Sequence, residues 1–201
     1  MLKALCMIPF VALVAMSAGS AAAATPKPAP AAPGSFAAQA DAACPASLNY
    51  TFPRLQDEKP QALCQYAGQV VLVVNTASYC GYTPQYKGLE ALYDKYRARG
   101  LVVLGFPSND FEQEKGSNKE IAEFCENTYG VRFPMFGASH VKGPGTNALY
   151  RRLAKTTQQP PEWNFYKYLI ARDGTILAVY PSKVTPEDPK LLAEIERQLA
   201  K

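Results

Sequence analysis

The sequence predicts an α/β domain in which a central mixed sheet is flanked by helices. Residues 70–74 and 101–106 form two short apolar runs that do not alternate with polar residues. Such runs are typical of strands that are covered on both faces. Residues 85–99, between them, carry apolar and aromatic side chains at helical spacing. Two such strands joined by a helix make a βαβ unit with parallel strands.

The second half of the chain continues with helices and one hairpin. Helices are expected at residues 118–129, 147–155 and 188–199, and strands at residues 166–172 and 175–180. Gly130 can end the first of these helices, and Asp173-Gly174 is a typical turn between antiparallel strands. A βαβ unit, a helical part, a hairpin and a closing helix, in this order, predict a thioredoxin-like fold.

An N-terminal β-hairpin is expected before the first central strand. Extended segments around residues 48–52 and 62–66 flank the turn Asp57-Glu58-Lys59-Pro60. Cys44 and Cys64 lie near the outer ends of this hairpin. In an exported protein a disulfide between them is expected, and the alternative is that one of them is buried and reduced.

The first 43 residues do not have the composition of a folded domain. Residues 1–24 contain Lys3, an apolar stretch and several alanines, which is typical of a secretory signal peptide. A retained membrane anchor is the alternative, although the segment is only marginally long enough to span a bilayer. Residues 25–43 are rich in Ala and Pro and predict a semi-rigid tether. We therefore expect a domain at residues 44–201 that is exported to the periplasm.

Charge and histidine content exclude some classes of function. The formal net charge is +4, and the basic residues are interspersed with acidic ones, so no nucleic-acid-binding footprint is present. His140 is the single histidine of the chain. It argues against a His-based zinc site, and against a Cys-His nucleophile pair unless it folds close to Cys80. A surface turn is its expected place.

Cys80 is the candidate nucleophile. It lies between a predicted strand and a predicted helix, with Thr83 as a possible N-cap and Pro84 as the first helical residue. Free N–H groups at a helix N-terminus favour a thiolate over a thiol. The alternative is a small buried apolar residue. Thr83 stands where a C-x-x-C motif has its second cysteine, which disfavours dithiol exchange and leaves peroxide reduction, acyl transfer or redox sensing.

Three blocks of sequence carry a resemblance to a known family. They are Asn75-Thr76-Ala77-Ser78-Tyr79-Cys80-Gly81, Phe106-Pro107-Ser108-Asn109 and Trp163-Asn164-Phe165. In this order they resemble the signature blocks of the glutathione peroxidase family in its cysteine form, and the resemblance runs over residues 46–199. It implies a thioredoxin fold and the reduction of hydrogen peroxide and organic hydroperoxides. It implies no cofactor beyond a thiol reductant as co-substrate.

The resemblance also implies site residues. Cys80 would be the peroxidatic nucleophile, which is oxidised to a sulfenic acid, and Trp163 and Asn164 would be polar groups around it. Indole and carboxamide N–H groups suit this role because they donate hydrogen bonds without changing charge. The alternatives are a core aromatic residue for Trp163 and a turn residue for Asn164.

Asp110 is a departure from the family, which usually has Gln at this position. An ionised carboxylate beside a thiolate would disfavour the thiolate. Three alternatives are open: Asp110 is protonated and donates a hydrogen bond, it points away and Gln113 or Asn109 replaces it, or the peroxidase is slower. The loop at residues 111–116 is also about one residue shorter than the usual family form.

Cys125 matches the resolving cysteine of thioredoxin-dependent members of the family. It would condense with oxidised Cys80 to form a disulfide. Its helix would then have to unwind in part, since a disulfide needs Cα atoms within about 7 Å. The alternative is a half-buried cysteine on a helix face. The resemblance implies a thioredoxin-like protein or glutathione as the reductant.

The sequence is also compatible with other functions and predicts an oligomeric state. The segment at residues 136–163 lacks the long insertion by which tetrameric family members associate, so a monomer is expected. A non-catalytic redox sensor or binding module on the same fold is one alternative function. A thiol-disulfide oxidoreductase is the other.

Overall fold

The computed structural model describes residues 43–114 and 116–201. The predicted signal peptide at residues 1–24, and the predicted tether except its last residue, lie outside the described residues, and these assignments stay predictions. None of the described helices is long and apolar enough to cross a membrane.

The central sheet of the described chain has four strands in the order β4-β3-β5-β6. The parallel strands β3 (Val70–Thr76) and β4 (Leu101–Pro107) are joined by α1 (Gln85–Tyr96) and a short 3-10 turn, η2 (Arg97–Arg99). Strand β5 (Lys167–Ile170) runs antiparallel to β3, and β6 (Ile176–Tyr180) runs antiparallel to β5. The mixed sheet and the βαβ unit are therefore confirmed.

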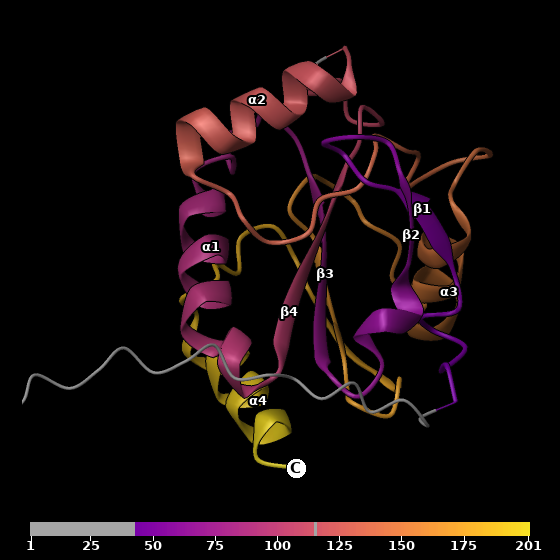
Figure 1. The fold of residues 1–201 in the computed structure, drawn as a ribbon, viewed down its shortest axis with the longest axis vertical. Coiled ribbons are helices and arrows are strands. Elements are labelled where there is room, and N and C mark those ends of the chain that lie inside the picture. The colour runs from indigo at the N-terminus through magenta and orange to yellow at the C-terminus, as the bar shows by residue number, and fades with distance from the viewer. Residues whose placement is uncertain (1–42, 115) are drawn as a thin grey trace, which may run out of the picture. The chain divides into compact units, whose positions relative to one another are not determined.

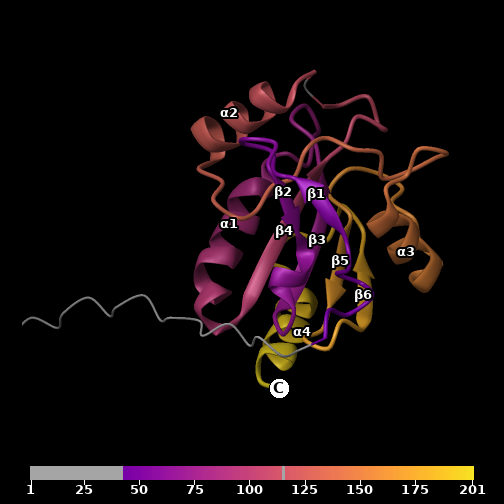
Figure 2. The same ribbon diagram turned by 45° about the vertical axis from the view of Figure 1, so that its right-hand side comes forward.

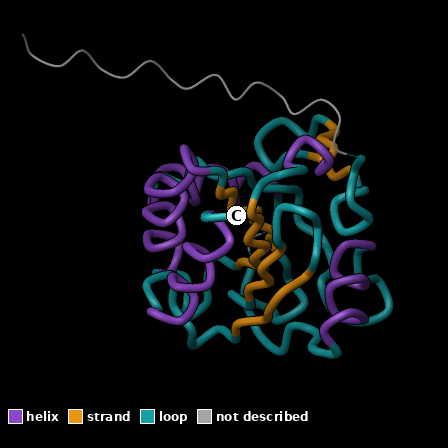
Figure 3. The backbone as a smooth tube through the Cα atoms, turned by 90° about the horizontal axis from the view of Figure 1, so that it is seen from below, coloured by secondary structure: helices purple, strands orange, loops and turns teal. Residues whose placement is uncertain are grey.

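Each face of the sheet is covered by its own apolar cluster. Leu72 and Val74 of β3 pack on one side with residues of α1 and of α4 (Pro189–Leu199). Val71 and Val73, which alternate with them, pack on the other side with residues of α3 (Ala148–Thr157) and with the N-terminal hairpin region. Figures 1 and 2 show these layers, and Figure 3 shows the strands between helices on either side. Burial on both faces explains why β3 has no polar alternation.

Helix α2 (Asn118–Tyr129) lies across the end of the sheet at which β3 and β4 finish (Figure 1). A capping box between Ser117 and Glu120 begins the helix, and Gly130, with φ of 63°, ends it. Functional groups of α/β proteins gather at this carboxyl edge of the strands. Cys80 and Asp110 follow β3 and β4 there.

The N-terminal hairpin is present but shorter than expected. Strands β1 (Thr51–Pro53) and β2 (Pro60–Ala62) pair antiparallel, and then Leu63–Tyr66 form a 3-10 turn, η1. The prediction of an extended segment up to residue 66 was wrong because Leu63 and Tyr66 turn inward and are buried. The predicted disulfide between Cys44 and Cys64 is confirmed, with 5.3 Å between the two Cα atoms.

Candidate active site

Cys80 lies in the loop between β3 and α1 and is only 6% exposed. Its Sγ atom accepts a hydrogen bond from the backbone N–H of Tyr82 at 3.4 Å. The backbone N–H of Gln85, the first residue of α1, bonds in turn to the carbonyl of Tyr82 at 2.9 Å. The sulfur therefore meets a backbone donor just ahead of the helix.

Thr83 does not have its predicted role as helix cap. Helix α1 begins after Pro84, and no side chain caps it. The buried hydroxyl of Thr83 instead accepts from the N–H of Cys80 at 3.0 Å and donates to the carbonyl of Ala77 at 2.9 Å. The helix starts two residues beyond Thr83, so its hydroxyl is available to close the loop. Thr83 thereby fixes the backbone that carries the sulfur.

Trp163, Asn164 and Phe165 form a turn that is fastened to β3. The side chain of Asn75 donates to the carbonyl of Trp163 at 3.0 Å, and its backbone carbonyl accepts from Phe165 N–H at 2.7 Å. Ser182 donates to the carbonyl of Asn164 at 2.6 Å. Asn75 lies five residues before Cys80, so the two sequence blocks meet at the end of one strand.

Gln113 connects this turn to the Cys80 loop. Its side-chain oxygen accepts from Asn164 Nδ2 at 3.1 Å, and its backbone carbonyl accepts from Tyr79 N–H at 3.0 Å. Asn164 is fully buried, and its side-chain oxygen has no hydrogen-bond partner among the described residues. Gln113 thus contacts both the residue before Cys80 and one of the predicted polar groups.

Asp110 points away from this arrangement. Its carboxylate accepts from the backbone N–H groups of Val141 and Lys142 at 2.6 and 2.9 Å, and it hydrogen-bonds with Nδ1 of His140 at 2.5 Å. Partial burial acts to raise the pKa of Asp110, but the bonds from His140 and the two amides outweigh it, so the pKa is lowered. The carboxylate is therefore ionised and fastened to the turn at residues 140–142. His140 lies exposed on this turn, as expected.

The turn at residues 140–142 reaches Trp163 through Phe111. The rings of Phe111 and Trp163 are 5.4 Å apart between centroids. The ammonium of Lys142 lies 5.5 Å from the centre of the Phe111 ring. Trp163 itself is 40% exposed. Asp110 is therefore linked to the Trp163 ring only indirectly, through this turn and Phe111, and it has no described bond to the Cys80 loop.

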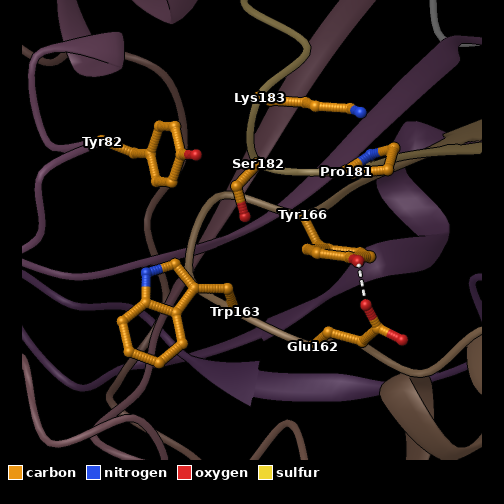
Figure 4. Close-up of a pocket in the computed structure, with 7 residues that line it drawn as sticks. All are labelled: Tyr82, Glu162, Trp163, Tyr166, Pro181, Ser182 and Lys183. Carbon is orange, nitrogen blue, oxygen red and sulfur yellow. Dashed lines mark hydrogen bonds between the residues drawn. The ribbon is translucent and has the colours of Figure 1, made fainter.

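An open pocket of about 410 Å³ lies beside Trp163. Figure 4 shows Tyr82, from the Cys80 loop, and Trp163 on neighbouring sides of it. The phenol of Tyr166 donates to the carboxylate of Glu162 at 3.0 Å. Lys183 completes the lining and has no ion pair among the described residues. The pocket offers aromatic surface, the ammonium of Lys183 and the carboxylate of Glu162 next to the cysteine loop.

Cys125 is a buried free thiol on α2. It is 2% exposed and belongs to the same apolar cluster as Cys80 and Phe165. Burial raises the pKa of the Cys125 thiol to about 11, so it is protonated at neutral pH. Within the described residues no group of three or more His, Cys, Asp or Glu side chains is placed to hold a metal ion.

Comparison with known proteins identifies the family. The family model for glutathione peroxidase matches residues 49–154. The chain belongs to the glutathione peroxidase family. The glutathione peroxidase-like peroxiredoxin gpx1 of Schizosaccharomyces pombe is 47% identical over 140 residues, which cover 67% of this chain and 89% of the relative. The thioredoxin/glutathione peroxidase BtuE of Escherichia coli is 41% identical over 72% of this chain and 93% of its own.

Solved structures agree with this assignment. The crystal structure of Trgpx in its apo form has a TM-score of 0.61 and 35% sequence identity, and it covers 77% of this chain and 95% of its own. A thioredoxin-family thiol:disulfide interchange protein from Chlorobium tepidum has a TM-score of 0.60 at 17% identity over 79% of this chain and 99% of its own, which shows the fold alone. The thioredoxin-like fold is therefore confirmed, and the chain is a thiol peroxidase whose co-substrate is a thiol reductant.

Substitution of Gln113 and of Asp110 separates their contributions. We expect Gln113→Ala to lower kcat/KM for hydrogen peroxide by on the order of tenfold, because Asn164 loses the partner that orients it. Asp110→Asn keeps a side chain of the same shape on the turn at residues 140–142, so we expect a change below about threefold. Stopped-flow peroxide consumption at saturating thiol donor measures both. A larger loss in Asp110→Asn than in Gln113→Ala would contradict this assignment.

Proposed function

We propose that Cys80 is the peroxidatic nucleophile of this thiol peroxidase and that Trp163, Asn164 and Gln113 form the polar surroundings of its sulfur. The observation that carries the proposal is the backbone N–H of Tyr82, which meets the Cys80 sulfur at the start of α1. Gln113 supports it, because this one residue contacts both the Cys80 loop and Asn164. Of the alternatives for Asp110, the one in which it points away and Gln113 replaces it fits these contacts.

In the proposed reaction the Cys80 thiolate attacks one oxygen of the peroxide. The S–O bond forms as the O–O bond breaks, which leaves Cys80 as a sulfenic acid and releases an alkoxide or hydroxide that takes a proton. Sulfur is oxidised by two electrons and the peroxide is reduced by two. Neutral N–H donors near the leaving oxygen stabilise its developing charge, and they do so without attracting the thiolate into an ion pair.

Cys125 is the proposed resolving residue. Its thiolate attacks the Cys80 sulfenic sulfur, a disulfide forms, and hydroxide leaves as water. Membership of one apolar cluster places the two cysteines on the same side of the sheet. The raised pKa of Cys125 keeps it unreactive while α2 is folded. Local unwinding of α2 would expose the thiol, restore its ordinary acidity and let it reach Cys80.

A protein dithiol of the thioredoxin type is the proposed reductant, with glutathione as the alternative. An intramolecular disulfide is the product that a dithiol protein reduces by exchange. One relative is named a peroxiredoxin and another a thioredoxin/glutathione peroxidase. The large exposed apolar side chains of the described domain are Tyr79 and Tyr82, which belong to the cysteine loop, and Trp163, which lines the pocket beside it. Exposed aromatic side chains of this kind suit a protein partner.

The pocket beside Trp163 suits the organic part of a hydroperoxide. A relative from Synechocystis, 42% identical over 71% of this chain and 90% of its own, is named a hydroperoxy fatty acid reductase. We propose that fatty acid hydroperoxides are substrates here, with the chain against Tyr82 and Trp163 and the carboxylate at Lys183. Hydrogen peroxide needs none of these contacts and would react independently of them.

Export and a monomeric state are further parts of the proposal. The disulfide between Cys44 and Cys64 is the kind of crosslink that persists in oxidising compartments outside the cytoplasm, which agrees with a signal peptide at residues 1–24. The short segment at residues 136–163 supports a monomer. Periplasmic location follows if the source is a bacterium with two membranes.

The two-cysteine mechanism predicts one product. After one equivalent of hydrogen peroxide, we expect peptide mass spectrometry to find a Cys80–Cys125 linkage, because the sulfenic acid is trapped by the second thiol. Cys125→Ser should lose turnover with a thioredoxin-type donor while its first peroxide reaction stays rapid. Cys80→Ser, the matched control, should lose both. A Cys80 sulfinic acid without any linkage in the wild type would rule out the resolving role.

Lys183→Gln tests the substrate pocket. We expect KM for a fatty acid hydroperoxide to rise about fivefold, since an exposed ion pair is worth up to about 1 kcal/mol. KM for hydrogen peroxide should be unchanged, because that substrate has no carboxylate. An equal effect on both substrates, or none on the fatty acid hydroperoxide, would contradict the pocket assignment.

Mass measurement tests the export proposal. When the full chain is expressed in a bacterium with a periplasm, we expect the periplasmic fraction to contain a protein shortened by residues 1–24, and its native mass should be that of one chain. Recovery of the full-length chain in the membrane fraction would instead support the retained anchor, and a multiple of the chain mass would exclude the monomer.

A further inference from the structure

Lys167 is a buried amine that the proposed chemistry does not use. It begins β5, directly after the turn that carries Trp163 and Asn164, and it is 0% exposed. Its Nζ atom donates to the carbonyl of Phe165 at 2.7 Å. Lysine is almost never fully buried without a partner, because removing its charge from water is costly.

The bond from Lys167 is one of three side-chain hydrogen bonds that the backbone of this turn accepts. The carbonyls of Trp163, Asn164 and Phe165 each accept a side-chain hydrogen bond, from Asn75, Ser182 and Lys167 in that order. The three donors come from β3, from the segment after β6 and from β5. Buried backbone carbonyls need hydrogen-bond donors, and here side chains from three elements serve three consecutive carbonyls.

Phe165 is the residue of this turn whose backbone needs support. Its φ is 62°, in the left-handed region that residues other than glycine seldom occupy. Its ring packs edge-on against Tyr86 at 5.3 Å, within the cluster that contains both free cysteines. The bond from Lys167 to the Phe165 carbonyl therefore holds the backbone at the residue that follows Trp163 and Asn164.

We propose that Lys167 is a positioning residue for the peroxidase reaction, which holds the turn at residues 163–165 through the carbonyl of Phe165. The proposal rests on the roles proposed above for Trp163 and Asn164. Lys167 touches neither substrate nor the reacting sulfur in this scheme. It acts through the turn alone.

The amine of Lys167 also changes charge at a pH near neutrality. Burial lowers its pKa to about 7, and Glu187, ahead of α4, acts weakly in the opposite direction. Across the sheet its neighbours are Val74 on β3 and Tyr180 on β6, and the pKa of Tyr180 is raised above 10, so neither changes charge near neutrality. A charged donor binds a carbonyl more strongly than a neutral amine. The hold on the turn therefore weakens as the pH rises through about 7.

Trp163 is the single tryptophan of the chain, so its fluorescence reports on the turn directly. Lys167→Met keeps an unbranched side chain and removes the donor. With excitation at 295 nm we expect emission at longer wavelength and stronger quenching by acrylamide than in the wild type. We also expect kcat/KM for hydrogen peroxide to fall by on the order of tenfold. Lys155→Met, on the exposed side of α3, is the control that should change none of these.

A pH titration distinguishes positioning from simple loss of packing. Wild-type emission should shift with a midpoint near pH 7, and this transition should be absent in Lys167→Met. His140→Gln is the second control, because His140 is the single histidine of the chain and lies on the turn that reaches Trp163 through Phe111. His140→Gln should keep the transition, and this arm tests the proposal even if Lys167→Met does not fold.

Two results would overturn the proposal. One is a folded Lys167→Met protein with the emission, quenching and rate of the wild type. The other is a transition that is lost in His140→Gln. If Lys167→Met alters the emission but leaves kcat/KM unchanged, the turn moves without affecting the reaction. That result would refute the proposed roles of Trp163 and Asn164, and with them the positioning role of Lys167. The fluorescence measurement thus tests whether Lys167 holds the turn, and the rate measurement tests whether the turn contributes to the reaction.

Discussion

The hydrogen bonds of Asn75 with the turn at residues 163–165 are the constraint on which the site depends. Asn75 and Trp163 are 88 positions apart in the chain, and a side-chain amide at the end of β3 joins them. Because Cys80 follows the same strand end, one buried residue sets the position of the nucleophile's loop and of its proposed polar partners. Ser182 and Lys167 then hold the two carbonyls that Asn75 does not reach.

The two free cysteines lie in different local structures. Cys80 is buried in a loop closed by Thr83, and its sulfur has a backbone donor. Cys125 lies inside α2, where desolvation holds the proton on its sulfur. In the proposed cycle α2 must therefore open in part, and the capping box at Ser117 and the left-handed Gly130 contribute to the free-energy cost of that opening.

Asp110 and Gln113 show that the conformation of a loop decides which of its side chains lies near the proposed active site. An ionised carboxylate would be unfavourable beside a thiolate. Asp110 is instead satisfied by three hydrogen bonds from the turn at residues 140–142, and Gln113 lies against Asn164. Motif position alone pointed to Asp110. The contacts favour Gln113, which was one of the two residues that could replace Asp110 near Cys80.

Most of the fold could be predicted from the sequence. The β-branched runs of β3 and β4, the helical spacing of α1 and the Asp173-Gly174 turn are local signals, and each determined its element to within a few residues. The sequence also indicated Cys80, Cys125, Trp163 and Asn164 as candidates, and the disulfide of the hairpin. Local sequence pattern gave wrong predictions at two places. It predicted an extended segment where a 3-10 turn follows β2, and it predicted a helix cap where the hydroxyl of Thr83 instead bonds to the Cys80 loop.

The orientation of side chains across the site was decided only by the tertiary structure. Lys167 carried one signal in the sequence, a lysine in an otherwise apolar strand, but its bond to Phe165 depends on a left-handed turn that no pattern predicts. The direction of Asp110 likewise depends on where the turn around His140 packs. Hydrophobic periodicity reports which face of an element is buried, whereas hydrogen-bond partners that are far apart in the chain are set by how the faces meet.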